Sequence, residues 1–274
     1  MGVLSDRSAL SASRSVFEDI YRDYNKRVYV SPDPLQFLYD YRAASDVEVV
    51  GLIASSLAYG KVTQILKSVG TVLDALGQHP AAYLASCDGE ELRLKLGGFV
   101  HRFTDEDAIV AFLSCIGGIL KHGGTLEDMF LSHYDGDMWA AVEGFASELM
   151  ACGGQKDMFL LPRPSKGSAC KRLALFLRWM VRCDEVDLGV WDRIKPETLF
   201  VPLDTHMFQI CSNLGLCTRK SADGRAAQEI TENFRIVCPS DPVRYDFAMT
   251  RFGIRSEMTH EQLFARWSEE NSIG

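Results

Sequence analysis

Pro202-Leu203-Asp204-Thr205-His206 opens an amphipathic segment that runs to Gly215. The apolar residues after this opening recur at helical spacing, namely Met207, Ile210, Cys211 and Leu214, and the pattern predicts a helix with one buried face. Asp204 stands just before that helix, at the N-cap position where a carboxylate accepts backbone N–H bonds and stabilises a helix by roughly 1 kcal/mol. Gly215 followed by Leu216 is typical of a helix end. The stretch therefore predicts a well-capped helix, and capping alone would explain Asp204.

The same helical periodicity recurs along most of the chain. It predicts further helices at residues 13–26, 61–76, 105–120, 137–151, 168–183, 224–236 and 241–252. Ser45 and Glu48 have the spacing of a capping box, which predicts a helix from there to Tyr59. Asp241 followed by Pro242 predicts another capped helix start. Because no strongly alternating strand series is present, the sequence predicts an all-α fold.

Composition is that of an ordinary globular protein. The chain has 274 residues, of which 47% are hydrophobic and 24% charged, and this length suffices for one large domain or two lobes with a shared core. The longest apolar run, residues 108–120, is too short and interrupted to cross a bilayer. The first residues lack the basic segment followed by an apolar block that is typical of a signal peptide, so none is predicted. We therefore expect a cytoplasmic protein with no membrane partner.

The eight cysteines are scattered, and no C-x-x-C pair occurs among them. Most of them fall inside apolar helical patterns, as Cys115 and Cys211 do. This distribution is typical of buried, reduced thiols. It predicts no zinc site and no other metal site.

Charge is uneven along the chain. The formal net charge of −8 argues weakly against nucleic acid as a partner, although a local basic face would be enough to bind phosphates. Cations nevertheless crowd one stretch, which contains Arg163, Lys166, Lys171, Arg172, Arg178, Arg182 and Arg193. On the predicted helix 168–183, Lys171, Arg178 and Arg182 share the face opposite an apolar face. This basic face is either simply solvated or a wall that binds phosphates.

Residues 202–215 resemble the segment of helix-hairpin-helix DNA glycosylases in which a V-D-T-H motif begins a helix. In that superfamily the Asp of the motif is the catalytic carboxylate. Bifunctional members carry a nucleophilic Lys at the start of the helix that follows a hairpin of L-P-G-x-G type. Here Leu161-Pro162 begins the corresponding region, Gly167 ends it, and Lys171 lies in the first turn of the next helix. The resemblance therefore implies that Lys171 is the nucleophile and Asp204 the catalytic carboxylate.

The chain also resembles, nearly end to end, a bacterial family that carries only an uncharacterised-protein label. The matching marks are residues 168–172, 176–182, 186–189 and 202–206. Compared with the glycosylases, the hairpin lacks G-x-G and the Lys-to-Asp separation is long, similar to that of archaeal 8-oxoguanine DNA glycosylases. The C-terminal cysteine spacing that binds an iron–sulfur cluster in some relatives is missing, since only Cys238 follows Cys217. We expect no cluster and no other cofactor.

The resemblance implies a two-lobed helix-hairpin-helix DNA glycosylase-like fold. Residues 46–195 would form a central lobe with Lys171, and residues 1–45 and 196–274 a second lobe with Asp204. The implied function is that of a DNA glycosylase with AP (β-)lyase activity in base excision repair, which binds damaged double-stranded DNA as a monomer. Its substrate would be an oxidised purine such as 8-oxoguanine, extruded from the duplex. The alternative is a helical nucleic-acid-binding protein without catalysis, in which Asp204 is only a cap; a small-molecule enzyme is a third possibility.

The residues expected to contact DNA phosphates are Lys166, Gly167, Arg172, Arg178 and Arg182. The residues expected to form a base pocket or wedge are Tyr59, Trp179 and His206. Tyr59 lies where superfamily members carry the side chain that fills the gap left by the flipped base, although packing on its own lobe would explain it equally well. Trp179 could stack on a base, although a position in the core explains it better. The cluster His101-Arg102-Phe103 combines polar and aromatic side chains, and no role is assigned to it.

Overall fold

The regular structure of this protein is almost entirely helical, which confirms the predicted all-α class. The computed structural model describes residues 7–152, 154, 158–255 and 257–271. Within these residues the α-helices are α1 (Arg7–Ala12), α2 (Arg14–Tyr24), α3 (Ala44–Ser56), α4 (Val62–Leu76), α5 (Pro80–Ser86), α6 (Gly89–Leu96), α7 (Glu106–Lys121), α8 (Leu126–Ser132), α9 (Met138–Cys152), α10 (Lys171–Val181), α11 (Thr205–Asn213), α12 (Gly224–Val237), α13 (Asp246–Ile254) and α14 (His260–Asn271). Short 3₁₀ helices occur at η1 (Arg27–Tyr29), η2 (Pro34–Asp40), η3 (Pro164–Lys166) and η4 (Pro196–Thr198). Strands β1 (Val100–His101) and β2 (Thr104–Asp105) form one antiparallel hairpin.

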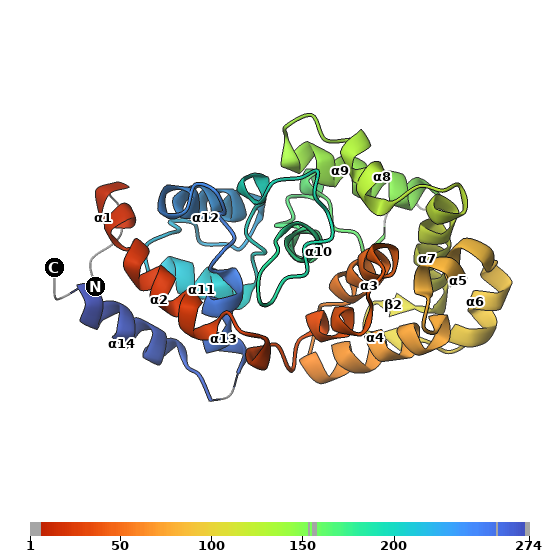
Figure 1. Ribbon diagram of the computed structural model, residues 1–274, viewed down its shortest axis with the longest axis horizontal. Helices are drawn as coiled ribbons and strands as arrows, with labels where there is room; N and C mark the ends of the chain where they lie inside the picture. Colours follow the sequence, from red (N-terminus) through yellow and green to blue (C-terminus); the bar gives the residue numbers. More distant parts are fainter. Residues whose placement is uncertain (1–6, 153, 155–157, 256, 272–274) are drawn as a thin grey trace.

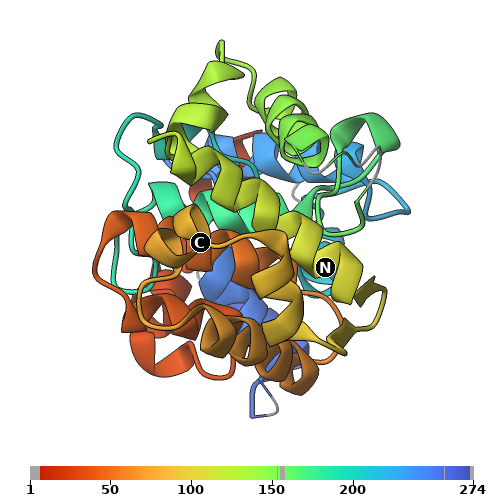
Figure 2. The same ribbon diagram turned by 90° about the vertical axis from the view of Figure 1, so that its right-hand side faces the viewer.

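The helices fall into two groups along the long axis of the molecule. Figure 1 shows α1 and α2 beside α11 to α14, so the two ends of the chain lie together, while α3 to α9 form the opposite end. Figure 2 looks at the molecule from that opposite end, with the C-terminal helices behind. Helix α10 lies between the groups and packs on α3, while α2 packs on α13. Lys171, at the start of α10, and Asp204, just before α11, lie where the two groups meet.

Four long helices begin and end within one residue of the prediction. The predicted segments 61–76, 105–120, 137–151 and 224–236 are observed as α4, α7, α9 and α12. At α7 the reason is a side-chain cap, because Asp105 accepts a hydrogen bond from the backbone N–H of Ala108 at 2.9 Å. Where periodicity and local capping agree, the sequence defines the helix.

The predicted capping box of Ser45 and Glu48 is wrong. Helix α3 has Ala43 at its N-cap and ends at Ser56, before the predicted end at Tyr59. Glu48 is buried, and its carboxylate accepts hydrogen bonds from the indole N–H of Trp191 at 3.0 Å and from a backbone N–H of α8. The side chain joins distant segments and does not cap its own helix.

The predicted helix start at Asp241 is also wrong, because α13 begins at Asp246. The Asp241 carboxylate accepts a hydrogen bond from Arg182 Nε at 2.8 Å. Its other oxygen, Oδ1, accepts no hydrogen bond among the described residues, so Asp241 does not cap a helix.

All eight cysteines are free thiols, as predicted, but they are not all buried, because Cys152 and Cys183 are exposed. In the part of the chain that the structure describes, no single helix is both long and apolar enough to cross a membrane; α7 and α8 satisfy the length and composition criteria only together, as a bent pair.

Candidate active site

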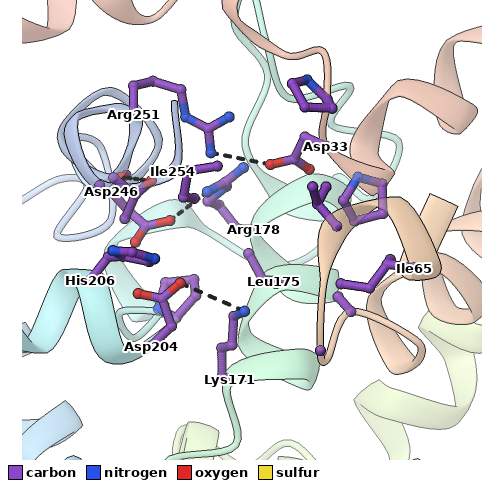
Figure 3. A pocket seen from close by; sticks show the side chains of 18 residues that line it. Asp33, Ile65, Lys171, Leu175, Arg178, Asp204, His206, Asp246, Arg251 and Ile254 are labelled. Carbon is purple, nitrogen blue, oxygen red and sulfur yellow. Dashed lines mark hydrogen bonds and ion pairs between the residues drawn. The ribbon is translucent and has the colours of Figure 1, made fainter. Parts of the chain in front are cut away.

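Lys171 and Asp204 face each other across the junction of the two helix groups. Figure 3 shows the two side chains pointing toward one another, with Lys171 Nζ 3.7 Å from Asp204 Oδ2. Lys171 begins α10 directly after Cys170, whose φ of 49° places it in the left-handed region. The Lys171 side chain is 33% exposed and that of Asp204 17%, so the pair is sheltered and still open to a ligand.

The predicted N-cap at Asp204 is confirmed. Asp204 Oδ1 accepts a hydrogen bond from the backbone N–H of Met207 at 2.8 Å. The predicted apolar face of α11 is buried as well, through Met207, Ile210 and Cys211. One carboxylate oxygen therefore caps α11, while the other faces Lys171.

The pair stands at the wall of an inner cavity of about 310 Å³, which lies at the low end of the range of about 300–1,000 Å³ for small-molecule sites. Its apolar lining includes Ile65, Leu175 and Ile254, as Figure 3 shows. Its polar lining consists of Asp33, Lys171, Arg178, Asp204, His206, Asp246, Thr250 and Arg251. A cavity of this size with apolar walls and charged groups suits a small, flat, polar ligand.

The charges deep in this cavity are paired. Arg178 donates to Asp187 at 3.2 Å and to Asp246 at 2.5 Å, and Arg251 donates to Asp33 at 3.1 Å. Burial opposes the charge on Arg178, but the two carboxylates outweigh it and raise its pKa. Burial raises the pKa of Asp246 to about 6, against the effect of Arg178. In the described part of the chain Asp246 Oδ1 has no hydrogen-bond partner, so this carboxyl group retains bonding capacity.

The prediction that Arg178 and Arg182 contact DNA phosphates is wrong. Both side chains are only 3% exposed. Arg182 is bound by carboxylates on every side, those of Asp184, Asp187 and Asp241. The helical wheel correctly separated an apolar face of α10 from a charged one, but α10 lies at the centre of the molecule and both faces are covered. The charged face is satisfied by a buried ion network instead of phosphates.

The prediction that Trp179 stacks on a base is wrong as well. Its side chain is fully buried, so its ring is unavailable to a ligand. Trp179 belongs to the core together with Phe176, as the alternative interpretation held.

Lys171 and Asp204 also line a second, outer cleft of about 480 Å³. Its lining comes from the turn before α10, the start of α11 and the start of α12, through Gly167, Ser168, Ala169, Cys170, Leu203, Thr205, Ala222 and Asp223. The start of α12 packs tightly on the turn: Gly224 N–H donates to Gly167 O at 3.1 Å, and a Cβ on Gly224 would lie 2.9 Å from Ser168 O. The Lys171–Asp204 pair therefore lines both the inner cavity and the more open outer cleft.

Arg172 and Tyr59 lie together at the rim of the outer cleft. The Arg172 guanidinium lies 5.1 Å from the ring centre of Tyr59 and 4.6 Å from that of Phe159. Burial lowers the pKa of Arg172 to about 10. The Tyr59 hydroxyl donates to His101 O at 2.8 Å and lies 2.6 Å from Thr104 Oγ1. Tyr59 is thus anchored to its own helix group.

Lys166, predicted to contact phosphates, and His206, predicted to form a base pocket, lie in different places relative to the two cavities. Lys166 is exposed at the end of η3, and it is not among the residues that line either cavity. His206 lines the inner cavity and lies close to His260, with ring centres 5.9 Å apart. Among the described residues neither His206 Nδ1 nor His260 Nε2 has a hydrogen-bond partner. Gly253 lies against both rings, because a Cβ there would be 2.4 Å from His206 Nδ1 and 2.6 Å from His260 Nε2.

Sequence reasoning missed several residues of this region, namely Asp33, Asp246, Arg251, Gly253 and His260. One signal could have revealed two of them: Asp246 and Arg251 are charged residues within an otherwise apolar helical segment. Such residues are rarely buried unless paired. In the residues described, no group of three or more His, Cys, Asp or Glu side chains is arranged to hold a metal ion.

Comparison with protein-family profiles identifies the family to which the chain belongs. The profile of one family, described as "Protein of unknown function (DUF2400)", matches residues 33–255. No curated protein and no solved structure gave a significant match. Because the matched region covers most of the chain, including Lys171 and Asp204, the chain belongs to this family of unknown function.

Proposed function

We propose that this protein is a DNA glycosylase with β-lyase activity that acts in base excision repair. The observation that carries the proposal is the 3.7 Å approach of Lys171 Nζ to Asp204 Oδ2 in the lining of both cavities. An amine beside a carboxylate is equipped for covalent attack followed by proton transfer. The resemblance of residues 202–215 to helix-hairpin-helix DNA glycosylases supports the same chemistry, and with it a two-lobed glycosylase-like fold.

The proposed reaction begins with an extruded nucleotide whose base enters the inner cavity. Lys171 Nζ forms a bond to C1′ while the bond from C1′ to the base breaks, and the base leaves with the electron pair. Asp204 accepts the proton that the attacking amine loses and returns it to the departing base. Its negative charge also stabilises the positive charge that develops on the sugar.

The lyase step follows from the covalent intermediate. The C1′–O4′ bond opens, O4′ takes up a proton, and a Schiff base joins Nζ to C1′. Loss of a proton from C2′ then breaks the C3′–O3′ bond and expels the 3′ phosphate. In this proposal Asp204, whose Oδ2 lies 3.7 Å from Lys171 Nζ, accepts the C2′ proton.

The outer cleft supplies a site for backbone phosphates. The starts of α11 and α12 are capped by Asp204 and Asp223. The start of α10 has no side-chain cap, and it carries the cations Lys171 and Arg172. Uncapped N–H groups at the positive end of a helix favour an anion. A phosphate at the start of α10 would bring the neighbouring sugar to Lys171.

The proposed lesion is an oxidised purine such as 8-oxoguanine. The long Lys-to-Asp separation supports this class through the resemblance to archaeal 8-oxoguanine DNA glycosylases. The inner cavity supports it through its volume of about 310 Å³ and through the carboxyl group of Asp246 in its wall, whose Oδ1 has no hydrogen-bond partner among the described residues. Carboxylates accept hydrogen bonds from ring N–H and amino groups, which a guanine-type base presents.

Borohydride trapping tests the proposal, because borohydride reduces a Schiff base to a stable amine and fixes the protein to DNA. Duplexes with an abasic site or with 8-oxoguanine are incubated with the wild type, Lys171→Gln and Lys121→Gln. We expect a covalent adduct with the wild type and with Lys121→Gln, whose side chain is exposed at the end of α7 and lines neither cavity, and none with Lys171→Gln. A wild type that binds damaged duplex without any adduct or base release would instead be a non-catalytic DNA-binding protein. An adduct with Lys171→Gln would mean that another residue is the nucleophile.

A further inference from the structure

The β1–β2 hairpin presents an aromatic side chain at its tip. Phe103 is 68% exposed, and it follows Arg102, whose φ of 52° lies in the left-handed region. The base of the hairpin is firmly held, because the His101 ring is buried with Nδ1 2.9 Å from Ser68 Oγ and Nε2 3.0 Å from Leu57 O. A tip that is fixed at its base and exposed at its end is suited to contact a partner.

Phe103 continues into a cluster of rings that reaches the outer cleft. Its ring centre lies 5.2 Å from that of Phe159, which lies 4.9 Å from that of Tyr59. Phe159 is 49% exposed. Within the described residues the exposed large hydrophobic side chains are Val28, Leu94, Val100, Phe103 and Phe159, and two of these, Phe103 and Phe159, belong to this surface. Covering one such ring is worth roughly 1.5–3 kcal/mol, so the surface is suited to binding.

The same surface is rich in guanidinium groups. Arg172 lies 4.6 Å from the ring centre of Phe159, and Arg102 lies 5.5 Å from that of Phe103. Asp105 and Asp107 line the same hollow as Phe103 and Phe159, where Asp105 caps α7 and Asp107 pairs with Arg93. The Arg172 guanidinium also donates to Ser56 O at 3.3 Å and to Phe159 O at 2.5 Å, which holds it beside the Phe159 ring. Exposed rings beside guanidinium groups match a nucleobase beside its phosphates, whereas an apolar peptide would leave the exposed Arg102 without an anionic partner.

We propose that Phe103 and Phe159 form a stacking platform for a nucleobase of the bound DNA. Phe159 and Tyr59 line the outer cleft together with Lys171 and Asp204, so the stacked base would be a neighbour of the nucleotide whose C1′ reaches Lys171. Phe103 would then occupy or border the gap that the extruded base leaves. Tyr59 anchors this platform through its hydroxyl and does not itself enter the duplex. The location of the DNA rests on the proposed function.

Binding to an uncleavable duplex tests the platform. The duplex carries a tetrahydrofuran abasic analogue with 2-aminopurine beside it, and the proteins are the full-length wild type, Phe103→Ala, Phe159→Ala and Leu94→Ala. Leu94 is the control because it is 86% exposed on α6. We expect each Phe variant to weaken binding on the order of tenfold, the equivalent of stacking on one base, and to reduce the change in 2-aminopurine fluorescence. Leu94→Ala should match the wild type.

Further variants separate stacking from simple apolar contact. Phe103→Trp, which keeps a flat ring, should retain binding and the fluorescence change, whereas Phe103→Leu should lose both. If both Phe→Ala variants bind like Leu94→Ala, or if the wild type does not bind this duplex, the platform is overturned. A platform that binds and stacks in a protein that never forms a borohydride adduct would leave the platform standing and remove the glycosylase activity. Normal adduct formation in a protein whose Phe variants show no loss of stacking would remove the platform and leave the glycosylase activity standing.

Discussion

Lys171 Nζ lies 3.7 Å from Asp204 Oδ2, although the two residues begin different helices that belong to different parts of the fold. The second oxygen of Asp204 accepts the N–H of Met207 at 2.8 Å and caps α11. The capping contact and the contact with Lys171 therefore fall on separate atoms of one side chain, and the proposed chemical role belongs to the second. Substitutions at this position can distinguish the two roles.

Asp204→Asn should keep the cap and lose the chemistry. Asn caps a helix about as well as Asp, whereas Ala costs roughly 1 kcal/mol. We expect the free energy of unfolding to be nearly unchanged in Asp204→Asn and to fall by about 1 kcal/mol in Asp204→Ala. Both variants should slow base excision by roughly 10²–10⁴-fold, the usual contribution of a proton-transferring group. Urea unfolding and single-turnover excision measure the two effects, and a wild-type rate in Asp204→Asn would show that Asp204 is only a cap.

Arg182→Ala should act on stability and not on DNA contact. The side chain is 3% exposed and holds Asp184, Asp187 and Asp241, so its removal leaves buried carboxylates without their partner. We expect the free energy of unfolding to fall by about 3–5 kcal/mol. Arg22→Ala is the control, since Arg22 is 66% exposed and the loss of an exposed ion pair should leave the free energy of unfolding nearly unchanged.

A second measurement on Arg182→Ala, the salt dependence of DNA binding, would reveal a phosphate contact. If Arg182→Ala unfolds like the wild type but has a weaker salt dependence of DNA binding, the side chain contacts phosphates. The buried network seen in the structure would then not describe its role.

The extent to which sequence predicted this structure is clearest in α10. Periodicity predicted the helix and its apolar face, and Leu173, Phe176 and Leu177 are indeed buried. It could not show that the opposite face is also covered, because the carboxylates that hold Arg178 and Arg182 include Asp241 and Asp246 from a distant segment. A helical wheel describes one helix alone, and the partner of each face is a tertiary property.

In the candidate site, too, local sequence patterns predicted some residues, while others meet only through the tertiary fold. The motif resemblance pointed to Lys171 and Asp204, and each lies at the start of its helix. Asp33 and Arg251 come from distant parts of the chain and meet only in the folded protein, 3.1 Å apart. Local patterns therefore predicted residues that begin helices, and they missed residues that close the cavity from elsewhere.

Asp246 should make stability depend on pH. Burial raises its pKa from 3.8 to about 6, so the folded protein binds this proton more tightly than the unfolded chain. The resulting stability is fully present below about pH 4 and is lost as pH rises through about 6. Relative to Asp246→Asn, which cannot titrate, we expect the wild type to lose up to about 3 kcal/mol between about pH 4 and pH 7, the equivalent of moving a pKa from 3.8 to about 6. Urea unfolding across this range measures the difference, and a difference that stays constant would show that Asp246 has an ordinary pKa.

Gly253→Ala should disturb the side of the inner cavity that His206 and His260 form. A Cβ at this position would lie 2.4 Å from His206 Nδ1 and 2.6 Å from His260 Nε2, so at least one ring must move. We expect a loss of about 1–3 kcal/mol in the free energy of unfolding and slower base excision, because His206 lies two residues after Asp204. Gly70→Ala on α4 is the matched control: a Cβ there meets nothing within 4 Å, and Ala in place of Gly stabilises a helix by up to about 1 kcal/mol. Equal stability and equal excision rates in the two variants would show that the rings have room to move apart and that their positions do not matter to the site.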